Sequence, residues 1–296
     1  MDYLQKYGYT PDGEAIASKL QSLAANLSGA ESPDVFMRCF SMMDLTTLHT
    51  NDTEASVKAL VEKANGVRSS FEGYPLPASV CVYPNFASVV RENRCSDELH
   101  VTTVAGCFPS SQSYLEVKLL ECRMAVRNGA DEVDIVLSLN YFMAGDYENA
   151  SREISEIRAA IDEEAAKEDR TVILKVILET GLLVTGERIA NASFLAMEAG
   201  ADFIKTSTGK VEVNATPKAA FVMCESIRAY YQATGRKVGF KAAGGISNAK
   251  DALSYYCIAS FVLGKEWLDK RWFRFGVSRL GNSLMSAIEQ KTVNYF

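Results

Sequence analysis

Short apolar runs alternate with longer amphipathic segments along most of this chain. The short runs are continuously apolar instead of alternating with polar residues, which is typical of strands covered on both faces. The longer segments repeat apolar residues at helical spacing and end at turn residues. Eight runs predict strands, at residues 42–45, 79–83, 101–105, 132–137, 172–178, 203–206, 238–241 and 272–276.

The segments between these strands predict helices. Their starts and ends are marked by capping residues and glycines, and they lie at residues 54–64, 114–127, 149–166, 187–198, 217–231 and 248–256. Alternating strands and helices over roughly 250 residues predict an α/β fold of the closed (β/α)₈ TIM-barrel type. An open doubly wound sheet is the rival fold, but no Gly-x-Gly-x-x-Gly follows the first strand to favour it.

The N-terminal part of the chain predicts one extra helix. Residues 1–36 contain a single helical pattern, with apolar residues at Ile16, Leu20, Leu23 and Leu27. We expect this segment to be a helical extension that covers an apolar end of the main domain. Residues 37–296 are expected to form a single barrel domain.

Composition narrows the classes of function. The 296 residues, 48% hydrophobic and 23% charged, are typical of a globular protein with a sizeable core. The net charge is −6 and no basic run is interleaved with aromatics, which argues against a nucleic-acid partner. The apolar stretches are too short to suggest a membrane span, and the N-terminus lacks the order of a secretory signal, so we expect a cytoplasmic protein.

The cysteine pattern argues against a metal site. The seven cysteines include no Cys-x-x-Cys pair, and only two histidines accompany them. We therefore expect mostly buried free thiols and no bound metal.

Three predicted strands carry a lysine inside apolar sequence. Lys175, Lys205 and Lys241 fall on the fifth, sixth and seventh strands. Reactive groups of TIM barrels come from the C-terminal ends of the strands, so lysines on consecutive strands are expected to converge on one pocket. The alternative is that they point outward, toward carboxylates of the helices.

Converging lysines suit covalent catalysis. Repulsion between ammonium groups and burial both lower a lysine pKa, and a free amine then becomes available near neutral pH. Such an amine can form an imine with a carbonyl substrate. The residues by themselves do not choose among the three lysines.

Carboxylates should accompany the amine, because imine chemistry moves protons at several steps. Asp134 lies inside the fourth strand, Asp44 ends the first, and Glu179 ends the fifth. Each is a candidate proton carrier or, alternatively, a structural partner of a buried lysine.

The loops after the last three strands predict a phosphate site. They are rich in glycine and small or basic residues, and read Thr206-Ser-Thr-Gly209-Lys210, Ala242-Ala-Gly244-Gly245 and Arg274-Phe-Gly276-Val-Ser278-Arg279. Glycine turns that lead into helices present bare amides to an anion, and barrels often bind phosphate at these loops. We therefore expect a small phosphorylated aldehyde or sugar as the substrate.

The lysine strands and the loops that follow them resemble those of the class I deoxyribose-phosphate aldolases. The two lysine segments, residues 202–210 and 238–245, are similar to the signature segments of that family. Further likeness spans nearly the whole barrel, at residues 44–48, 80–84, 132–134, 174–181 and 274–276.

The resemblance implies reversible cleavage of 2-deoxy-D-ribose 5-phosphate to D-glyceraldehyde 3-phosphate and acetaldehyde, without a metal or organic cofactor. It implies that Lys205 forms the Schiff base, that Lys241 lowers the pKa of Lys205, and that Asp134 relays protons. It assigns the substrate-binding network to Asp44, Thr206, Lys175, Gly209, Lys210, Gly244, Gly245, Gly276 and Ser278.

Several positions depart from the family pattern. Ala242 replaces a usual proline, Ser247 stands where some members have a phosphate-contacting arginine, and Arg279 replaces a serine. Many members end in a tyrosine, whereas here Tyr295 precedes a final Phe296. We expect these changes to affect substrate affinity and turnover more than the fold.

Alternatives to an active deoxyribose-phosphate aldolase remain. One is a barrel that kept the lysines but lost efficient catalysis, and now has a binding or scaffold role. Another is a different imine-forming barrel, such as a sugar-bisphosphate aldolase, which the specific lysine segments disfavour. Cys81, near the mouth in the family, is either a reactive thiol or a small buried residue. A homodimer is a candidate assembly because such barrels commonly dimerise, but no helix face identifies the contact.

Overall fold

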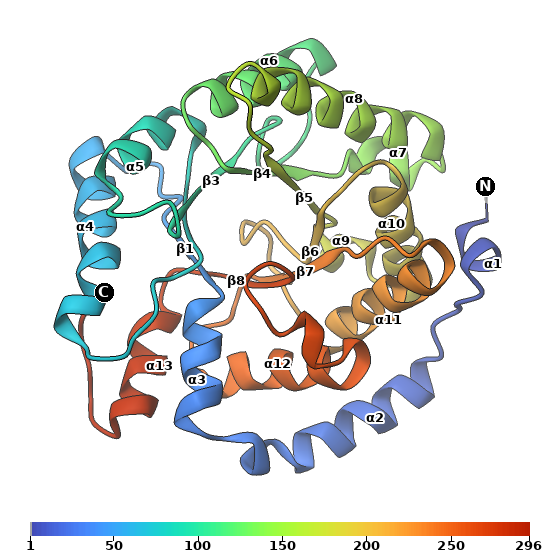
Figure 1. Ribbon diagram of the computed structural model, residues 1–296. Coiled ribbons are helices and arrows are strands. Elements are labelled where there is room, and N and C mark those ends of the chain that lie inside the picture. Colours follow the sequence, from blue (N-terminus) through green and yellow to red (C-terminus); the bar gives the residue numbers. More distant parts are fainter. Residues whose placement is uncertain (1) are drawn as a thin grey trace.

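Eight parallel strands close into a barrel in the computed structural model, which describes residues 2–296 (Figure 1). The strands follow one another around the barrel in chain order, so the predicted TIM-barrel fold is confirmed and the open sheet is wrong. Their bounds differ from the predicted ones by at most two residues: β1 (Met43–Thr46), β2 (Ser79–Val82), β3 (His100–Val104), β4 (Glu132–Val136), β5 (Ile173–Ile177), β6 (Phe203–Lys205), β7 (Gly239–Ala243) and β8 (Phe273–Val277).

Helices surround the barrel (Figure 1). They are α4 (Glu54–Ser70), α5 (Ala87–Asn93), α6 (Leu115–Arg127), α7 (Leu139–Met143), α8 (Tyr147–Ala166), α9 (Thr180–Leu183), α10 (Gly186–Glu198), α11 (Pro217–Thr234), α12 (Ala249–Leu263) and α13 (Leu280–Glu289), with short 3₁₀ turns η2 (Pro84–Phe86) and η3 (Lys265–Trp267). Six of these helices were predicted. The others are mostly a turn or two long, so they show little periodicity in the sequence.

Three predicted helices extend further than expected, α11 by three residues to Thr234 and two others by six or more. Helix α4 continues past Gly66 to Ser70 because Val67 is fully buried against the core, and this packing outweighs the low helix propensity of glycine. Helix α12 continues to Leu263, where Val262 and Leu263 are buried in the same way.

The N-terminal segment packs along the outside of the barrel. It contains α1 (Tyr3–Tyr7), α2 (Gly13–Ala25), η1 (Leu27–Ala30) and α3 (Pro33–Ser41), of which α2 is the predicted helix. In Figure 1 α2 runs along α11 and α12, and both helices contact it. The expected boundary between the N-terminal extension (residues 1–36) and the barrel domain (residues 37–296) falls inside α3. Phe40 of this helix is fully buried in the main core. The segment is thus continuous with the barrel in packing.

Strand register depends on close packing inside the barrel. Gly239 on β7 pairs with Phe203 on β6, and a Cβ atom at Gly239 would lie 2.4 Å from the Phe203 ring. A glycine is required because real Cβ atoms do not approach other atoms so closely. The same register places Lys205 opposite Lys241.

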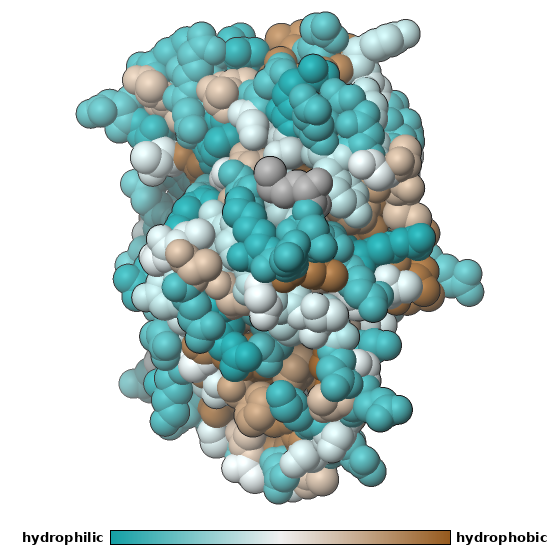
Figure 2. All heavy atoms as spheres, turned by 90° about the vertical axis from the view of Figure 1, so that its right-hand side faces the viewer, coloured by the Kyte–Doolittle hydropathy of each residue, from teal (hydrophilic) through white to brown (hydrophobic). Residues whose placement is uncertain are grey.

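The outer surface is largely polar where it faces solvent. Figure 2 shows the face that carries α1, on which hydrophilic residues predominate and apolar ones gather only in small groups. Within residues 2–296, no helix combines the length and apolar character that a membrane crossing requires.

Candidate active site

The register of β4 to β7 brings the three strand lysines together. Asp134 pairs with Lys175, Ile177 pairs with Lys205, and Lys205 pairs with Lys241. Because side chains alternate between the two faces of a strand, these pairings direct the charged side chains to the same face of the sheet, the barrel interior.

All three lysine amines reach one carboxylate. Lys175 Nζ lies 2.9 Å from Asp134 Oδ1, while Lys205 Nζ and Lys241 Nζ each lie 2.8 Å from Asp134 Oδ2. Asp134, Lys175 and Lys241 are fully buried, and Lys205 is 4% exposed. The expected convergence is confirmed, and the outward-pointing alternative is wrong.

Lys205 has a lowered pKa. Burial, which disfavours the charged ammonium, is the largest cause, and the positive charge of Lys241 adds to it while Asp134 opposes it. The structure therefore favours a free amine at Lys205, as imine formation requires.

The other two lysines behave differently from the expectation that clustering lowers every lysine pKa. Burial would lower the pKa of Lys241, but Asp134 and Asp44 outweigh burial and raise it. Burial would likewise lower the pKa of Lys175, but Asp134 and Glu132 raise it. Both side chains therefore stay charged.

Asp134 stays ionised between these cations. Burial would raise the pKa of its carboxyl, but Lys175, Lys205 and Lys241 together hold the pKa well below its usual range. The site thus places an ionised carboxylate within hydrogen-bond reach of the amine whose pKa is lowered, the arrangement needed to pass protons to and from that amine.

A cavity of about 250 Å³ opens above Lys205. Its walls come from the loops after β1, β6, β7 and β8, at the C-terminal ends of the strands. The predicted residues Lys205, Gly209, Lys210, Gly244, Gly245, Gly276 and Ser278 line it, together with Thr46, Leu48, His49, Thr208, Ala243, Ile246, Ser247, Val277 and Arg279. This volume holds a small metabolite.

The backbone of the cavity wall exposes amide groups. Gly209, Gly244 and Gly245 have φ values of 80°, 86° and 81°, in the left-handed region that favours glycine. A Cβ atom at Gly209 or Gly245 would meet nothing within 4 Å, so the space above these residues is open. The open backbone can approach an anion closely.

Two side chains connect the loops around the cavity. Lys210 Nζ donates to the carbonyl oxygen of Leu48 at 2.7 Å, which ties the loop after β6 to the loop after β1. The buried Glu179 accepts from Thr208 N at 3.1 Å and from Thr208 Oγ1 at 2.6 Å. Glu179 therefore holds the loop after β6 in place through Thr208, which differs from the predicted structural role as partner of a buried lysine.

Three predicted substrate-binding residues do not line the cavity. Asp44 and Lys175 are fully buried among the charged side chains. Thr206 is fully buried as well, and its Oγ1 bonds to the backbone of Ala243, donating to O at 3.0 Å and accepting from N at 2.9 Å. In this structure Asp44 contacts Lys241, Lys175 contacts Asp134 and Thr206 holds the loop after β7, and their contact with a substrate stays a prediction.

Known aldolases resemble this chain in sequence. Residues 39–260 match the family model described as DeoC/LacD family aldolase. The chain is 37% identical over 278 residues to a "putative deoxyribose-phosphate aldolase" of Caenorhabditis elegans, covering 91% of this chain and 86% of that protein. This chain belongs to the DeoC/LacD aldolase family.

Solved structures resemble this aldolase in fold. The deoxyribose-phosphate aldolase of Aeropyrum pernix is 25% identical, with a TM-score of 0.66 over 93% of this chain and 98% of that one. The apo form of a "putative deoxyribose-phosphate aldolase" of Toxoplasma gondii has a TM-score of 0.72 at 22% identity, over 87% and 98% of the two chains, which shows the shared fold alone.

Two buried residues of the aldolase site were not singled out in the sequence. Arg274 contacts Asp44 and Glu132, and Glu132 contacts Lys175. Both residues carry the signal that identified the lysines, a charged residue inside an apolar strand, at Phe273-Arg274-Phe275 and Glu132-Val133-Asp134. Their mutual contact could not be anticipated, since β4 and β8 lie on different sides of the barrel.

Cys81 of the aldolase is a buried core residue. It is fully buried in a cluster with Leu48 and Val104, and burial raises the pKa of its thiol. A neutral, inaccessible thiol is the unreactive one of the two predicted alternatives.

The C-terminal tyrosine lies away from the aldolase cavity. Tyr295 Oη donates to the carbonyl oxygen of Lys63 at 2.9 Å, and its ring packs edge-on against Phe71. Phe296 packs on Phe40, and neither terminal residue lines the cavity.

Arg279 does line the cavity, as do Lys210 and Ser247. It therefore brings a positive charge to the cavity wall, where Ser247 is uncharged. Within residues 2–296, no group of three or more His, Cys, Asp and Glu side chains is placed to hold a metal ion.

Proposed function

We propose that this aldolase cleaves 2-deoxy-D-ribose 5-phosphate reversibly to D-glyceraldehyde 3-phosphate and acetaldehyde, through a Schiff base at Lys205. The observation that carries the proposal is the position of Lys205. Of the three lysines on Asp134, it alone lines the cavity, and it alone has a lowered pKa. Membership of the DeoC/LacD family and the name of the C. elegans relative support the same substrate.

Imine formation begins with the free amine of Lys205, which attacks the aldehyde carbon C1 of the open-chain sugar. The carbonyl oxygen takes a proton to give a carbinolamine, and this hydroxyl then leaves as water. Asp134, 2.8 Å from the amine, is placed to take the proton that the nitrogen loses and to return it to the departing oxygen. Lys175 and Lys241 keep Asp134 oriented and ionised between these steps.

Carbon–carbon cleavage follows from the iminium. The C3 hydroxyl gives up its proton to Asp134 through an intervening water, the C2–C3 bond breaks, and its electron pair moves into the enamine while glyceraldehyde 3-phosphate leaves. The same proton can then return to the enamine carbon C2. Protonation of the enamine carbon C2 and hydrolysis of the imine release acetaldehyde and restore Lys205. Asp134 is the buried carboxylate nearest to the nitrogen in this sequence of steps.

The phosphate of the substrate is proposed to lie against the loops after β6, β7 and β8. Gly209 and Gly245 supply an open backbone there, and Lys210 and Arg279 supply positive charge. Gly276 packs closely beneath this subsite. A glycine is needed there because a Cβ atom would lie 2.8 Å from Ala243 Cβ and 3.1 Å from Lys241 Cε. Ser278 offers a hydroxyl group at the same wall.

Reductive trapping tests the proposal directly. The protein is incubated with acetaldehyde, reduced with borohydride and digested, and mass spectrometry locates the added ethyl group. We expect the label on Lys205, together with release of glyceraldehyde 3-phosphate from deoxyribose 5-phosphate in a separate assay. In Lys205→Leu the label should disappear and kcat/KM should fall by about 10⁴-fold or more. The exposed Lys250, changed to leucine, is the matched control.

The same assays separate the alternatives. A labelled Lys205 without turnover of deoxyribose 5-phosphate would favour the binding or scaffold role. Turnover of a sugar bisphosphate in its place would favour a different aldolase. Full activity in Lys205→Leu would remove the mechanism.

A further inference from the structure

The barrel interior holds a continuous network of buried charges. It contains three carboxylates and four cationic side chains, each at most 4% exposed: Asp44, Glu132, Asp134, Lys175, Lys205, Lys241 and Arg274. Charges taken out of water this completely are stable only where they compensate one another. The balance of charge in this network therefore constrains which members can be ionised together.

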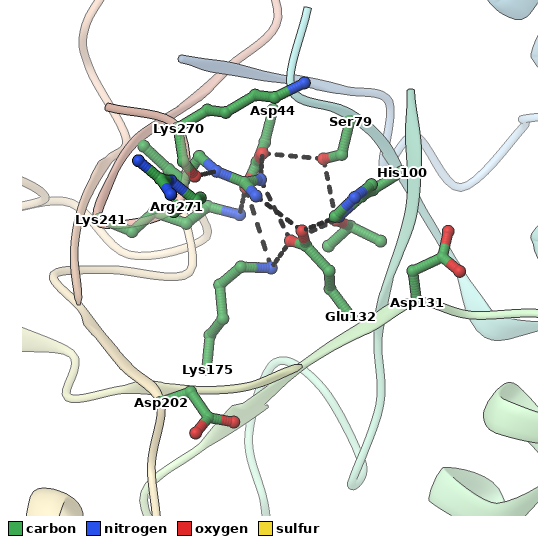
Figure 3. Close-up of polar contacts among 12 residues, drawn as sticks. Asp44, Ser79, His100, Asp131, Glu132, Lys175, Asp202, Lys241, Lys270 and Arg271 are labelled. Atoms are coloured by element: carbon green, nitrogen blue, oxygen red, sulfur yellow. Dashed lines mark hydrogen bonds and ion pairs between the residues drawn. The ribbon is translucent and has the colours of Figure 1, made fainter. Parts of the chain in front are cut away.

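Arg274 and Glu132 belong to the part of the network that does not line the cavity. Arg274 Nη1 lies 2.5 Å from Asp44 Oδ1, and Arg274 Nη2 lies 2.7 Å from Glu132 Oε1. Glu132 in turn contacts the amine of Lys175. Figure 3 shows Asp44, Glu132 and Lys175 directed toward one another inside the barrel, whereas Asp131 points away from them.

Four cations exceed three carboxylates by one charge. Arg274 cannot lose its proton under ordinary conditions, so neutrality requires one neutral lysine. Lys175 has Glu132 and Asp134 as close partners, and Lys241 has Asp44 at 2.5 Å and Asp134 at 2.8 Å.

Lys205 is the least compensated of the three lysines. Within residues 2–296, the ion pairs of its amine are limited to one, with Asp134, which it shares with both other lysines. Its proton is therefore the easiest to remove, and its loss makes the network electrically neutral.

We infer that Arg274 and Glu132 are positioning residues that set the protonation of Lys205 through the charge balance of the barrel interior. The inference rests on the proposed role of Lys205 as the imine-forming residue. Neither residue lines the cavity, so both act through other side chains: Arg274 compensates Asp44 and Glu132, and Glu132 keeps Lys175 charged.

The remaining groups that face the network leave its charge count unchanged. Ser79 and Thr102 are neutral hydrogen-bond donors, with Ser79 Oγ 2.8 Å from Asp44 Oδ1 and Thr102 Oγ1 3.1 Å from Glu132 Oε2. The Cys81 thiol is neutral, since burial raises its pKa. His100 Nδ1 lies 2.6 Å from Glu132 Oε1 with its side chain 33% exposed, and the count of four cations against three carboxylates holds for the neutral form of this imidazole.

Competitive labelling measures the pKa of Lys205 without any need for turnover. Trace acetic anhydride acetylates only free amines, and mass spectrometry follows the acetylation of each lysine against pH. Arg274→Gln removes one positive charge and should move the Lys205 midpoint upward by about one pH unit. This is the effect of a charge roughly 10 Å away at an effective dielectric constant of about 20. Arg271→Gln, which removes an exposed arginine three residues earlier in the chain, should leave the midpoint in place.

A compensating variant separates charge balance from a structural effect. Arg274→Gln combined with Glu132→Gln removes one charge of each sign, so the midpoint should return to the wild-type value. Arg274→Lys, which keeps the charge, should also retain it. An unshifted midpoint in Arg274→Gln, or a midpoint that stays displaced in the double variant, would overturn the inference.

A second pair of variants tests the inference if Arg274→Gln does not fold. If Arg274→Gln does not fold, Glu132→Gln and the double variant are compared: the Lys205 midpoint should fall below the wild-type value in the first and return in the second. Equal midpoints in the two would count against the inference. A wild-type Lys205 that titrates like an exposed lysine would instead contradict the proposed function, so the two failures are distinguishable.

Discussion

Lys205 and Lys241 lie opposite each other on neighbouring strands, and both amines are 2.8 Å from the same atom, Asp134 Oδ2. Their pKa values nevertheless move in opposite directions. The difference is that Lys241 has a second carboxylate, Asp44 Oδ2, at 2.5 Å, whereas Lys205 borders the cavity. One shared carboxylate thus contacts a lysine with a raised pKa and a lysine with a lowered pKa.

Lys241→Met should move the acidic limb of the kcat/KM profile upward. The charge of Lys241 adds to burial in lowering the pKa of Lys205, so its removal lets Lys205 hold its proton to higher pH. We expect a shift of about one to two pH units toward higher pH, with the free amine lost below the new midpoint. Lys241→Arg, which keeps the charge, is the control. An unchanged acidic limb would mean that Lys241 does not tune Lys205.

Asp134→Asn should lower kcat by about 10² to 10⁴-fold, the usual contribution of one proton-transferring group. The same change removes the negative charge that raises the pKa of Lys205, so the acidic limb should move to lower pH while the maximum falls. Stopped-flow measurement of imine formation and a full pH profile check both effects. Asp97→Asn, whose side chain is 96% exposed, should behave like the wild type. A lower kcat with no shift of the limb would contradict the assigned contact.

Lys210→Met should impair the phosphorylated substrate selectively. The ammonium group of Lys210 lines the cavity wall beside the open glycine backbone, and a charge-assisted hydrogen bond contributes about 1.5 to 3 kcal/mol. We expect kcat/KM for deoxyribose 5-phosphate to fall by about 10 to 100-fold. The value for unphosphorylated deoxyribose should change little. An equal loss of kcat/KM for both sugars would mean that Lys210 does not contact the phosphate. Lys218→Met on the exposed surface is the matched control.

Tyr7→Ala should destabilise the whole barrel. The Tyr7 ring stacks on Phe194 of α10 with centroids 4.5 Å apart, and its hydroxyl donates to Glu198 at 2.6 Å. Loss of this part-buried ring should lower the free energy of unfolding by about 2 kcal/mol, measured by urea denaturation. Tyr114→Ala, at a ring that is 80% exposed, should change it by less than about 0.5 kcal/mol. Equal stability of the two variants would show that residues 1–36 fold apart from the barrel.

Much of the fold is predictable because local signals repeat. The strands are short, continuous apolar runs, and their ends differ from the predicted ones by one or two residues at most. The short helices α1 and α7 were missed because five residues make little more than one helical turn and show no clear periodicity. The extension of α4 past Gly66 depends on the burial of Val67, a tertiary contact that outweighs local propensity.

The features of the site also divide into those that local sequence patterns predict and those that depend on tertiary contacts. From the amino-acid sequence follow the alternation of elements, the lysines on consecutive strands and the glycine loops that line the cavity, since each is a local pattern. Only the tertiary structure decided that Asp44, Thr206 and Lys175 lie beneath the cavity instead of in its wall, and that Arg274 and Glu132 complete the buried network. A pKa depends on distances to charges on other strands, and those distances exist only once the barrel has closed.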